Sequence, residues 1–299
     1  MFISEVKKMS EEKETALQRT ENKEHKRHHR LRNICLFLII MLGIWYFNNY
    51  TIKINEVRLT SDKIRNPVRI AVISDLHAHH LSISNSRIVS RIEKSEPDIV
   101  VMLGDMYTWG SSDDKIKLAV DLAGDIVDSG YPLYFVSGEH DNDRQYIKAI
   151  ESAGAHVMNY QEEITDINGT SFQILGIDNV YYSPTFDLRN EFRLRSDCYS
   201  ILLAHIPNFD AFASFGADLT LCADTHGGMI QLPFDMGPIY SNAYNMWFPQ
   251  MKTDDVIYDK GLFPYDGGNM FITSGLGDNP APVRLNNRPE VAVIEIDPE

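Results

Sequence analysis

The sequence repeatedly places acidic and histidine side chains directly after short apolar runs. Carboxylates and imidazoles are groups that bind metal ions and transfer protons. Five runs are followed by such residues, which are Asp75, His77, Asp105, Glu139, His140, Asp141, His205, Asp224 and His226. Ligand sites of α/β sheets lie at the carboxyl ends of strands, so the five groups are expected to converge on one place. The order of the five groups along the chain is the informative feature, because a single Asp-x-His arises by chance about once in such a chain.

The elements that must position these groups are predicted to form an α/β domain. Short β-rich runs at residues 68–74, 98–103 and 132–137 alternate with helical spacing at 86–94 and 115–128, which predicts βαβ units. A further helix is expected over residues 144–153. Shorter strands are then expected at residues 172–176, 199–204, 219–222, 270–273 and 291–296. We interpret these strands as an additional sheet.

A region without clear periodicity, residues 229–268, is rich in aromatic residues, glycine and proline, as a loop over a site can be. Its aromatic residues fit either an acyl-chain groove or a packed loop. These residues are Tyr240, Tyr244, Trp247 and Phe248.

The N-terminus differs in composition from the rest of the chain. Residues 1–33 have nine Lys and Arg against six Glu and few large apolar residues, which predicts a disordered tail. Residues 34–47 have no polar side chain. As a helix they would be about 21 Å long, against a hydrocarbon core of roughly 30 Å, so the length alone also fits a secretory segment or a buried helix.

The flanks of this apolar run favour a membrane anchor. No small-residue cleavage site follows it, basic residues precede it, and Trp45, Tyr46 and Tyr50 suit a membrane interface. We therefore predict a signal-anchor transmembrane helix over residues 34–50. The excess of basic residues places residues 1–33 in the cytoplasm and the domain of residues 51–299 outside it, as a single-pass membrane protein.

The net charge bears on possible partners. The chain carries a formal charge of -14, and because residues 1–33 contribute +3, the remainder carries -17. An acidic domain of this kind is a poor nucleic-acid binder, so no nucleic acid is expected as a partner. No obligate protein partner is evident. A hydrophobic content of 43% with 23% charged residues is typical of a folded globular protein.

The order of these motifs resembles the metal-binding signature of the calcineurin-like metallophosphoesterases, D-x-H, G-D, G-N-H-D/E, H and G-H-x-H. The matching residues are Asp75-Leu76-His77, Gly104-Asp105, Gly138-Glu139-His140-Asp141, His205 and Asp224-Thr225-His226. The segment from Ser274 to Val291 resembles the close of a membrane-anchored bacterial subfamily. The resemblance implies a four-layer α/β/β/α sandwich and two divalent metal ions, such as Mn, Fe or Zn.

The resemblance also implies a role for each site residue. The first metal would be held by Asp75, His77 and His226, and Asp105 would bridge both metals. The second metal would be completed by Glu139, His205 and Asp224. His140 resembles the family's catalytic histidine beside the leaving group, and Asp141 could orient its ring or cap the next helix. Arg284 could bind a phosphate of the substrate or form a structural salt bridge.

Two residues depart from the family pattern. Glu139 replaces an Asn and Asp224 replaces a His. Four carboxylates would cancel the charge of two divalent ions and make them weaker Lewis acids. The site could thus be tuned to a harder metal, be slower, or be retired. Two functions follow: a hydrolase of a phosphomonoester, phosphodiester or pyrophosphate, possibly lipid-linked, or a non-catalytic anchored module that binds metal and a ligand.

Overall fold

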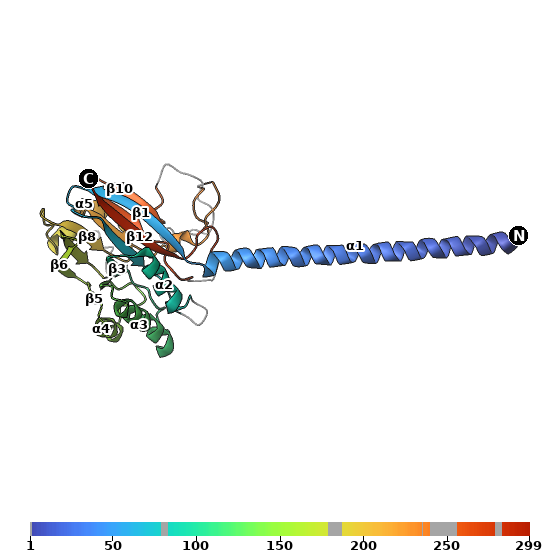
Figure 1. Ribbon diagram of the computed structural model, residues 1–299, viewed down its shortest axis with the longest axis horizontal. Coiled ribbons are helices and arrows are strands. Elements are labelled where there is room, and N and C mark those ends of the chain that lie inside the picture. Colours follow the sequence, from blue (N-terminus) through green and yellow to red (C-terminus); the bar gives the residue numbers. More distant parts are fainter. Residues whose placement is uncertain (1, 79–82, 179–186, 235, 240–255, 279–282) are drawn as a thin grey trace. The chain divides into compact units, whose positions relative to one another are not determined.

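The computed structural model describes residues 2–78, 83–178, 187–234, 236–239, 256–278 and 283–299, with side chains described from residue 25 onward. The chain divides into two compact units, Met1–Phe47 and Asn48–Glu299. The first unit is part of a long helix, α1 (Phe2–Tyr50), whose last three residues belong to the second unit (Figure 1). In the part of the chain that the structure describes, the strands and the remaining helices lie in the second unit.

Helix α1 contains one stretch long and apolar enough to cross a membrane, His25–Tyr50, with a mean hydropathy of 1.6. The large apolar side chains from Ile34 to Phe47 are exposed, as those of a lipid-facing helix would be. The tail of residues 1–33 was expected to be disordered, whereas α1 already begins at Phe2. The division of the chain at residues 33 and 50 stays a prediction.

Two six-stranded sheets form the second unit. The first has the order β1-β12-β2-β3-β4-β5, and the second has the order β10-β11-β9-β8-β7-β6. The strands of the first sheet are β1 (Lys53–Ser61), β12 (Glu290–Pro298), β2 (Val68–Ile73), β3 (Ile99–Met102), β4 (Leu133–Phe135) and β5 (His156–Val157). Those of the second are β10 (Gly261–Tyr265), β11 (Gly268–Ile272), β9 (Leu219–Cys222), β8 (Tyr199–Leu203), β7 (Thr170–Gly176) and β6 (Gln161–Ile167).

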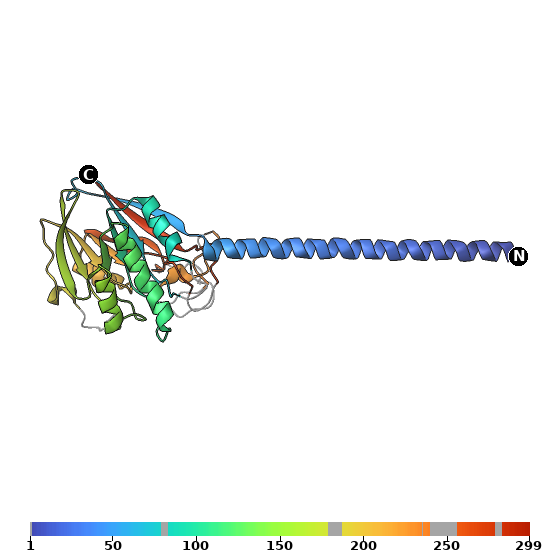
Figure 2. The same ribbon diagram turned by 60° about the horizontal axis from the view of Figure 1, so that its bottom comes forward.

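The alternation of side chains along the strands builds four layers. In β2, Ala71 and Ile73 pack under helices α2 (Asn85–Ser95), α3 (Asp113–Asp128) and α4 (Arg144–Ser152). Ile70 and Val72 point the other way and pack against the second sheet. Figure 2 shows the three helices side by side along the first sheet.

The outer face of the second sheet packs against two shorter helices, α5 (Phe209–Phe215) and the 3-10 helix η1 (Leu188–Asn190). The predicted α/β/β/α sandwich is therefore confirmed.

One strand was assigned to the wrong sheet. Residues 291–296 were predicted in the additional sheet, but β12 lies in the first, antiparallel to β2 and parallel to β1. The reason is packing: Val291 and Val293 join the core under the helices, while Ala292 and Ile294 join the core between the sheets. Strand β1, which covers the other edge of β12, was not predicted.

The topology sets the place of the site. Strands β2, β3 and β4 run parallel in one sheet, and β7, β8 and β9 run parallel in the other. The carboxyl ends of neighbouring parallel strands meet at one edge, where ligands bind in α/β sheets.

Asp218, which directly precedes β9, provides a test of what stabilises the pairing of β8 with β9. Its carboxylate accepts hydrogen bonds of 2.7 Å from Ser200 N and Ser200 Oγ in β8, and Lys63 Nζ, from the β1–β2 connection, lies 2.8 Å away. Asp218→Ala leaves these donors without their acceptor, so the free energy of unfolding should fall by about 2–4 kcal/mol. The control Lys63→Met should cost at most about 1 kcal/mol. Urea denaturation in detergent measures the free energy of unfolding of both variants. Equal losses would contradict the view that the Ser200 hydrogen bonds stabilise the fold more than the contact with Lys63.

Candidate metal centre

The predicted site residues follow strands of both sheets. Asp75 and His77 follow β2, Asp105 follows β3, and Glu139 and His140 follow β4. From the second sheet, His205 follows β8, and Asp224 and His226 follow β9. The loops after β2 and β3 are joined by hydrogen bonds, because Asp75 N donates to Gly104 O and His77 N to Asp105 O, each at 3.0 Å.

Five of these residues have a left-handed backbone. The φ angles are 49° at Asp75, 44° at His77, 53° at Asp105, 67° at Asp224 and 50° at His226. The left-handed conformation costs a residue with a Cβ roughly 1–2 kcal/mol. Such conformations gather at functional sites, where the surrounding structure holds them.

The first close group consists of Asp75, His77 and His226, all buried. His77 Nε2 lies 3.2 Å from His226 Nε2, and His226 Nε2 lies 3.8 Å from Asp75 Oδ1. The other nitrogen of His77, Nδ1, lies 3.1 Å from Thr108 Oγ1. Two imidazole nitrogens that face each other beside a carboxylate oxygen form a donor set for a cation.

The second close group consists of Asp75, Asp105 and His205. His205 Nε2 lies 3.3 Å from Asp105 Oδ2 and 4.0 Å from Asp75 Oδ1. His205 Nδ1 lies 2.6 Å from the Leu103 carbonyl, to which a neutral ring would donate its N–H. Nε2 would then present its lone pair to the carboxylates, which is the usual arrangement of a metal-binding histidine.

A metal fits these groups. Among the described residues, the buried atoms Asp75 Oδ1 and His205 Nε2 have no hydrogen-bond partner. Buried polar atoms are nearly always hydrogen-bonded, so such orphans call for an explanation. Carboxylate and imidazole donors within 4.8 Å of one another provide one, because they can coordinate a shared ion.

Burial dominates the electrostatics of the centre. It raises the pKa of Asp75 to about 7, although His205 opposes the rise, and the pKa of Asp224 to about 6. Burial lowers the pKa of His77 to about 3. For His205 burial also favours the neutral ring, but the carboxylates of Asp105, Asp75 and Asp224 together outweigh burial and hold the pKa of His205 well above the usual value. The side chains of the protein alone thus supply too little positive charge to offset the burial of these carboxylates.

His140, at the edge of this cluster, forms a third close group with His77 and Asp105. Its Nε2 lies 4.0 Å from Asp105 Oδ2, and its Nδ1 accepts a hydrogen bond of 3.1 Å from Trp109 N. Both expectations for Asp141 are wrong. Its carboxylate accepts from Gly138 N at 2.7 Å and Met106 N at 2.9 Å, so it joins the loops after β3 and β4.

The cap of α4 is Asp143, whose carboxylate accepts from Gln145 N and Tyr146 N. Gly138 permits the close approach of the two loops, because a Cβ there would lie 2.1 Å from Asp105 Oδ1.

The two departures from the family pattern lie in different environments. Asp224 Oδ1 is 3.7 Å from His205 Nε2, and the side chain is 14% exposed. Glu139 Oε1 is 3.8 Å from His140 Nε2, but the side chain is 51% exposed. Among the described residues, neither joins a close group of potential ligands. Asp224 therefore lies at the cluster and Glu139 at its rim.

The structure gives Arg284 a different environment from the predicted phosphate contact. The residue is 2% exposed, and its guanidinium donates to the carbonyl oxygens of Ser274 and Gly277. These donors are therefore engaged with the main chain. A salt bridge was the other expectation for this residue, and the recorded partners are carbonyls instead. Phosphate binding by Arg284 stays a prediction that these contacts do not favour.

Several supporting residues were missed by the sequence analysis. Ser74 Oγ donates to Asp75 Oδ2 at 2.5 Å, and Asn287 Nδ2 donates to His226 O at 2.7 Å. No pattern in the sequence distinguishes these residues, although Asn287 lies in the segment that resembles the family. The aromatic residues Tyr240, Tyr244, Trp247 and Phe248 lie outside the described residues.

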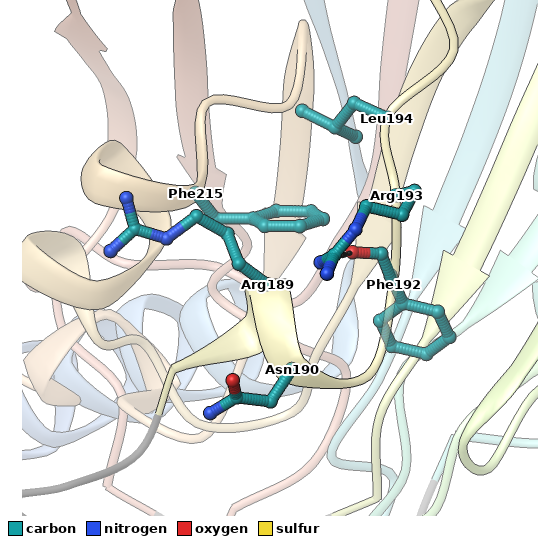
Figure 3. A pocket seen from close by; sticks show the side chains of 6 residues that line it. All are labelled: Arg189, Asn190, Phe192, Arg193, Leu194 and Phe215. Carbon is teal, nitrogen blue, oxygen red and sulfur yellow. Dashed lines mark hydrogen bonds between the residues drawn. The ribbon is translucent and has the colours of Figure 1, made fainter.

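A surface pocket of about 490 Å³ lies elsewhere (Figure 3). None of its lining residues belongs to the predicted centre. They are Arg189, Asn190, Phe192, Arg193, Leu194 and Phe215. Arg189 pairs with Asp187 at 2.9 Å. The pocket is therefore separate from the candidate metal centre.

Known proteins resemble this chain over most of its length. A family model described as calcineurin-like phosphoesterase matches residues 68–228. The metallophosphoesterase YkuE of Bacillus subtilis is 24% identical over 237 residues, which cover 76% of this chain and 78% of YkuE. The phosphodiesterase YaeI of Escherichia coli is 25% identical over 244 residues, which cover 77% and 82%. Among solved structures, TT1561 of Thermus thermophilus is 10% identical, with a TM-score of 0.43, and covers 70% of this chain and 90% of that one.

The different positions of Asp224 and Glu139 lead to a test. Asp224→Ala removes a carboxylate beside His205 and should weaken Mn²⁺ binding by about 10–100-fold. Glu139→Ala removes a half-exposed carboxylate, and its loss should be roughly threefold or less. Calorimetric titration with Mn²⁺ measures both, with Asp121→Ala on the exposed face of α3 as the control. A larger loss for Glu139→Ala would overturn this ranking.

Proposed function

The chain belongs to the calcineurin-like phosphoesterase family, and we propose that it hydrolyses a phosphate ester by means of two divalent metal ions. One observation carries the proposal: Asp105 is shared by two close groups of potential ligands, one with His77 and His140 and one with Asp75 and His205. A carboxylate in that position is suited to bridge two ions.

The ligands divide between the two ions. We assign Asp75, His77 and His226 to the first ion, with Asp105 as the bridge. His205 and Asp224 are assigned to the second, and Glu139, which the resemblance also gives to this ion, stands at its rim. When bound by these residues, such ions would supply the activation of a water and the neutralisation of charge on the phosphate oxygens. The mixture of carboxylates and imidazoles suits Mn, Fe or Zn.

His140 is the proposed catalytic residue. Because Trp109 N donates to its Nδ1, the neutral ring carries its hydrogen on Nε2, the nitrogen that lies 4.0 Å from Asp105 Oδ2. An N–H in this position can donate a hydrogen bond to the leaving oxygen as negative charge develops on it. The contact with Trp109 thus favours hydrogen-bond donation by a neutral ring over transfer of a proton from an imidazolium.

The relatives and the N-terminal helix support the proposed substrate class. YaeI carries the name phosphodiesterase, which supports a phosphodiester, and phosphomonoesters and pyrophosphates share the same chemistry. The candidate span His25–Tyr50 leads directly into the second unit, which begins at Asn48. A domain tethered to a bilayer by this helix would favour a membrane-associated, lipid-linked substrate. The basic residues before the span favour a domain outside the cytoplasm.

Asp105 and His140 have separable roles that a pair of variants can test. Asp105→Ala should lose most bound metal and all hydrolysis of bis(p-nitrophenyl) phosphate, because the bridge is gone. His140→Ala should keep the metal and lose about 100-fold or more in kcat, because it acts on the transition state. The control is His156→Ala, which removes an exposed histidine paired with Glu163. Metal content and kcat are the measurements.

A metal-free wild type, or no hydrolysis by it with Mn, Fe, Co, Ni or Zn, would favour the non-catalytic binding module.

The membrane orientation is tested separately. Residues 1–33 carry an excess of basic residues, and Lys53 is the first one after the apolar run. Alkaline phosphatase fused after Glu299 should therefore be active, because it folds only outside the cytoplasm, while a cytoplasmic reporter at the same place should be silent. The reverse pattern would refute the orientation and leave the chemistry of the site untouched.

A further inference from the structure

The first two residues of the second unit are buried amides. Asn48 is 7% exposed and Asn49 is 4% exposed, although they directly follow the apolar run. Asn49 Oδ1 accepts a hydrogen bond of 2.7 Å from Arg284 N, and its Nδ2 donates to Arg284 O at 3.2 Å. Asn48 Oδ1 accepts from Asn286 N at 2.9 Å. The end of α1 is thereby fixed to a segment more than 230 residues away in sequence.

Arg284 extends this connection towards the centre. Its guanidinium is buried and donates from Nε to Gly277 O at 2.8 Å and from Nη2 to Ser274 O at 2.8 Å. A buried guanidinium needs acceptors for its donors, so these carbonyls hold Arg284 in place as much as Arg284 holds them. Moving the main chain of Arg284 would therefore move the segment from Ser274 to Gly277.

That segment lies directly against Asp75. Gly277 N donates to Asp75 O at 2.7 Å, and Leu276 N donates to Ser74 O at 2.9 Å. A Cβ on Gly275 would lie 2.8 Å from Asp75 Cβ, so the two segments are in direct contact. A shift of the segment would therefore displace the Asp75 backbone and its carboxylate.

A second connection reaches His226. Asn287, next to the Asn286 amide that Asn48 binds, donates from Nδ2 to His226 O at 2.7 Å. A Cβ on Gly227 would lie 2.8 Å from Asn287 Oδ1, which shows how closely the two segments pack. Both connections therefore end on ligands of the first close group.

We infer that Asn49 and Asn48 are positioning residues, which hold Asp75 and His226 in metal-binding geometry through Arg284 and Asn287. The inference rests on the proposed function, because it concerns ligands that the proposal assigns. Positioning partners of metal ligands typically change metal affinity by about 10–100-fold when they are lost. The last residues of α1 would then support the metal centre and also begin the second unit.

The test measures metal binding by the full chain in detergent. Asn49→Ala should raise the Kd for Mn²⁺ about tenfold or more and should change the visible absorption of bound Co²⁺, which reports ligand geometry. The matched control is Gln173→Ala. Gln173 is also a buried amide that joins two segments, since it donates to Arg193 O at 2.8 Å and accepts from Arg195 N at 2.9 Å. Gln173→Ala should lower the melting temperature about as much as Asn49→Ala does. It should leave the Kd for Mn²⁺ and the Co²⁺ spectrum unchanged.

Each outcome decides a different point. Equal Mn²⁺ affinity and equal Co²⁺ spectra for wild type and Asn49→Ala would overturn the inference alone. The same increase in Kd for Gln173→Ala would show that only general stability was lost, and would also overturn it. A wild type that binds neither metal would refute the proposed function, and the inference with it. If Asn49→Ala does not fold, Asn48→Ala takes its place, with an expected loss of Mn²⁺ affinity of roughly threefold. An unchanged Mn²⁺ affinity for Asn48→Ala would then overturn the inference.

Discussion

The burial of Asp75, Asp105 and His205 in one small volume is the constraint on which the rest of this structure depends. Removing a carboxylate from water costs several kcal/mol unless a cation or hydrogen bonds compensate. Compensation is partial here: Ser74 donates to Asp75, and His140 N donates to Asp105 Oδ1. Asp75 Oδ1 and His205 Nε2 have no hydrogen-bond partner among the described residues. Divalent ions would supply the missing charge, so metal binding and folding of the second unit are expected to be coupled.

The topology of the two sheets brings these groups together. Parallel strands deliver their carboxyl ends to one edge, and the left-handed residues after β2, β3 and β9 turn the chain sharply as soon as each strand ends. A helical or extended continuation at Asp75 or Asp105 would direct the carboxylate elsewhere. The free energy stored in these conformations must be offset by the core between the sheets, where apolar side chains from strands of both sheets are buried.

Patterns in the sequence predicted the parallel strands and the strand ends well, because both depend on local features. The apolar run of β2 and the Asp75-Leu76-His77 motif after it can be read within ten residues of chain. The placement of β12 could not be read this way, since its partners β1 and β2 lie more than 200 residues away. The same reason hides the supporting residues. Asn49 and Asn287 are ordinary polar residues in sequence, and only burial beside distant partners gives them a role.

The position of Glu139 changes the charge argument that the sequence alone suggests. Four carboxylates would cancel two divalent ions, which would leave no excess charge to attract a phosphate or to polarise a water. In the structure, the Glu139 side chain is 51% exposed and, among the described residues, belongs to no close group of potential ligands, so water screens its charge. The three buried carboxylates Asp75, Asp105 and Asp224 would leave about +1 on the cluster. Glu139 in place of the family's Asn therefore lowers the positive charge of the cluster less than the sequence alone suggests. For that reason the geometry favours a working phosphoesterase over a retired site.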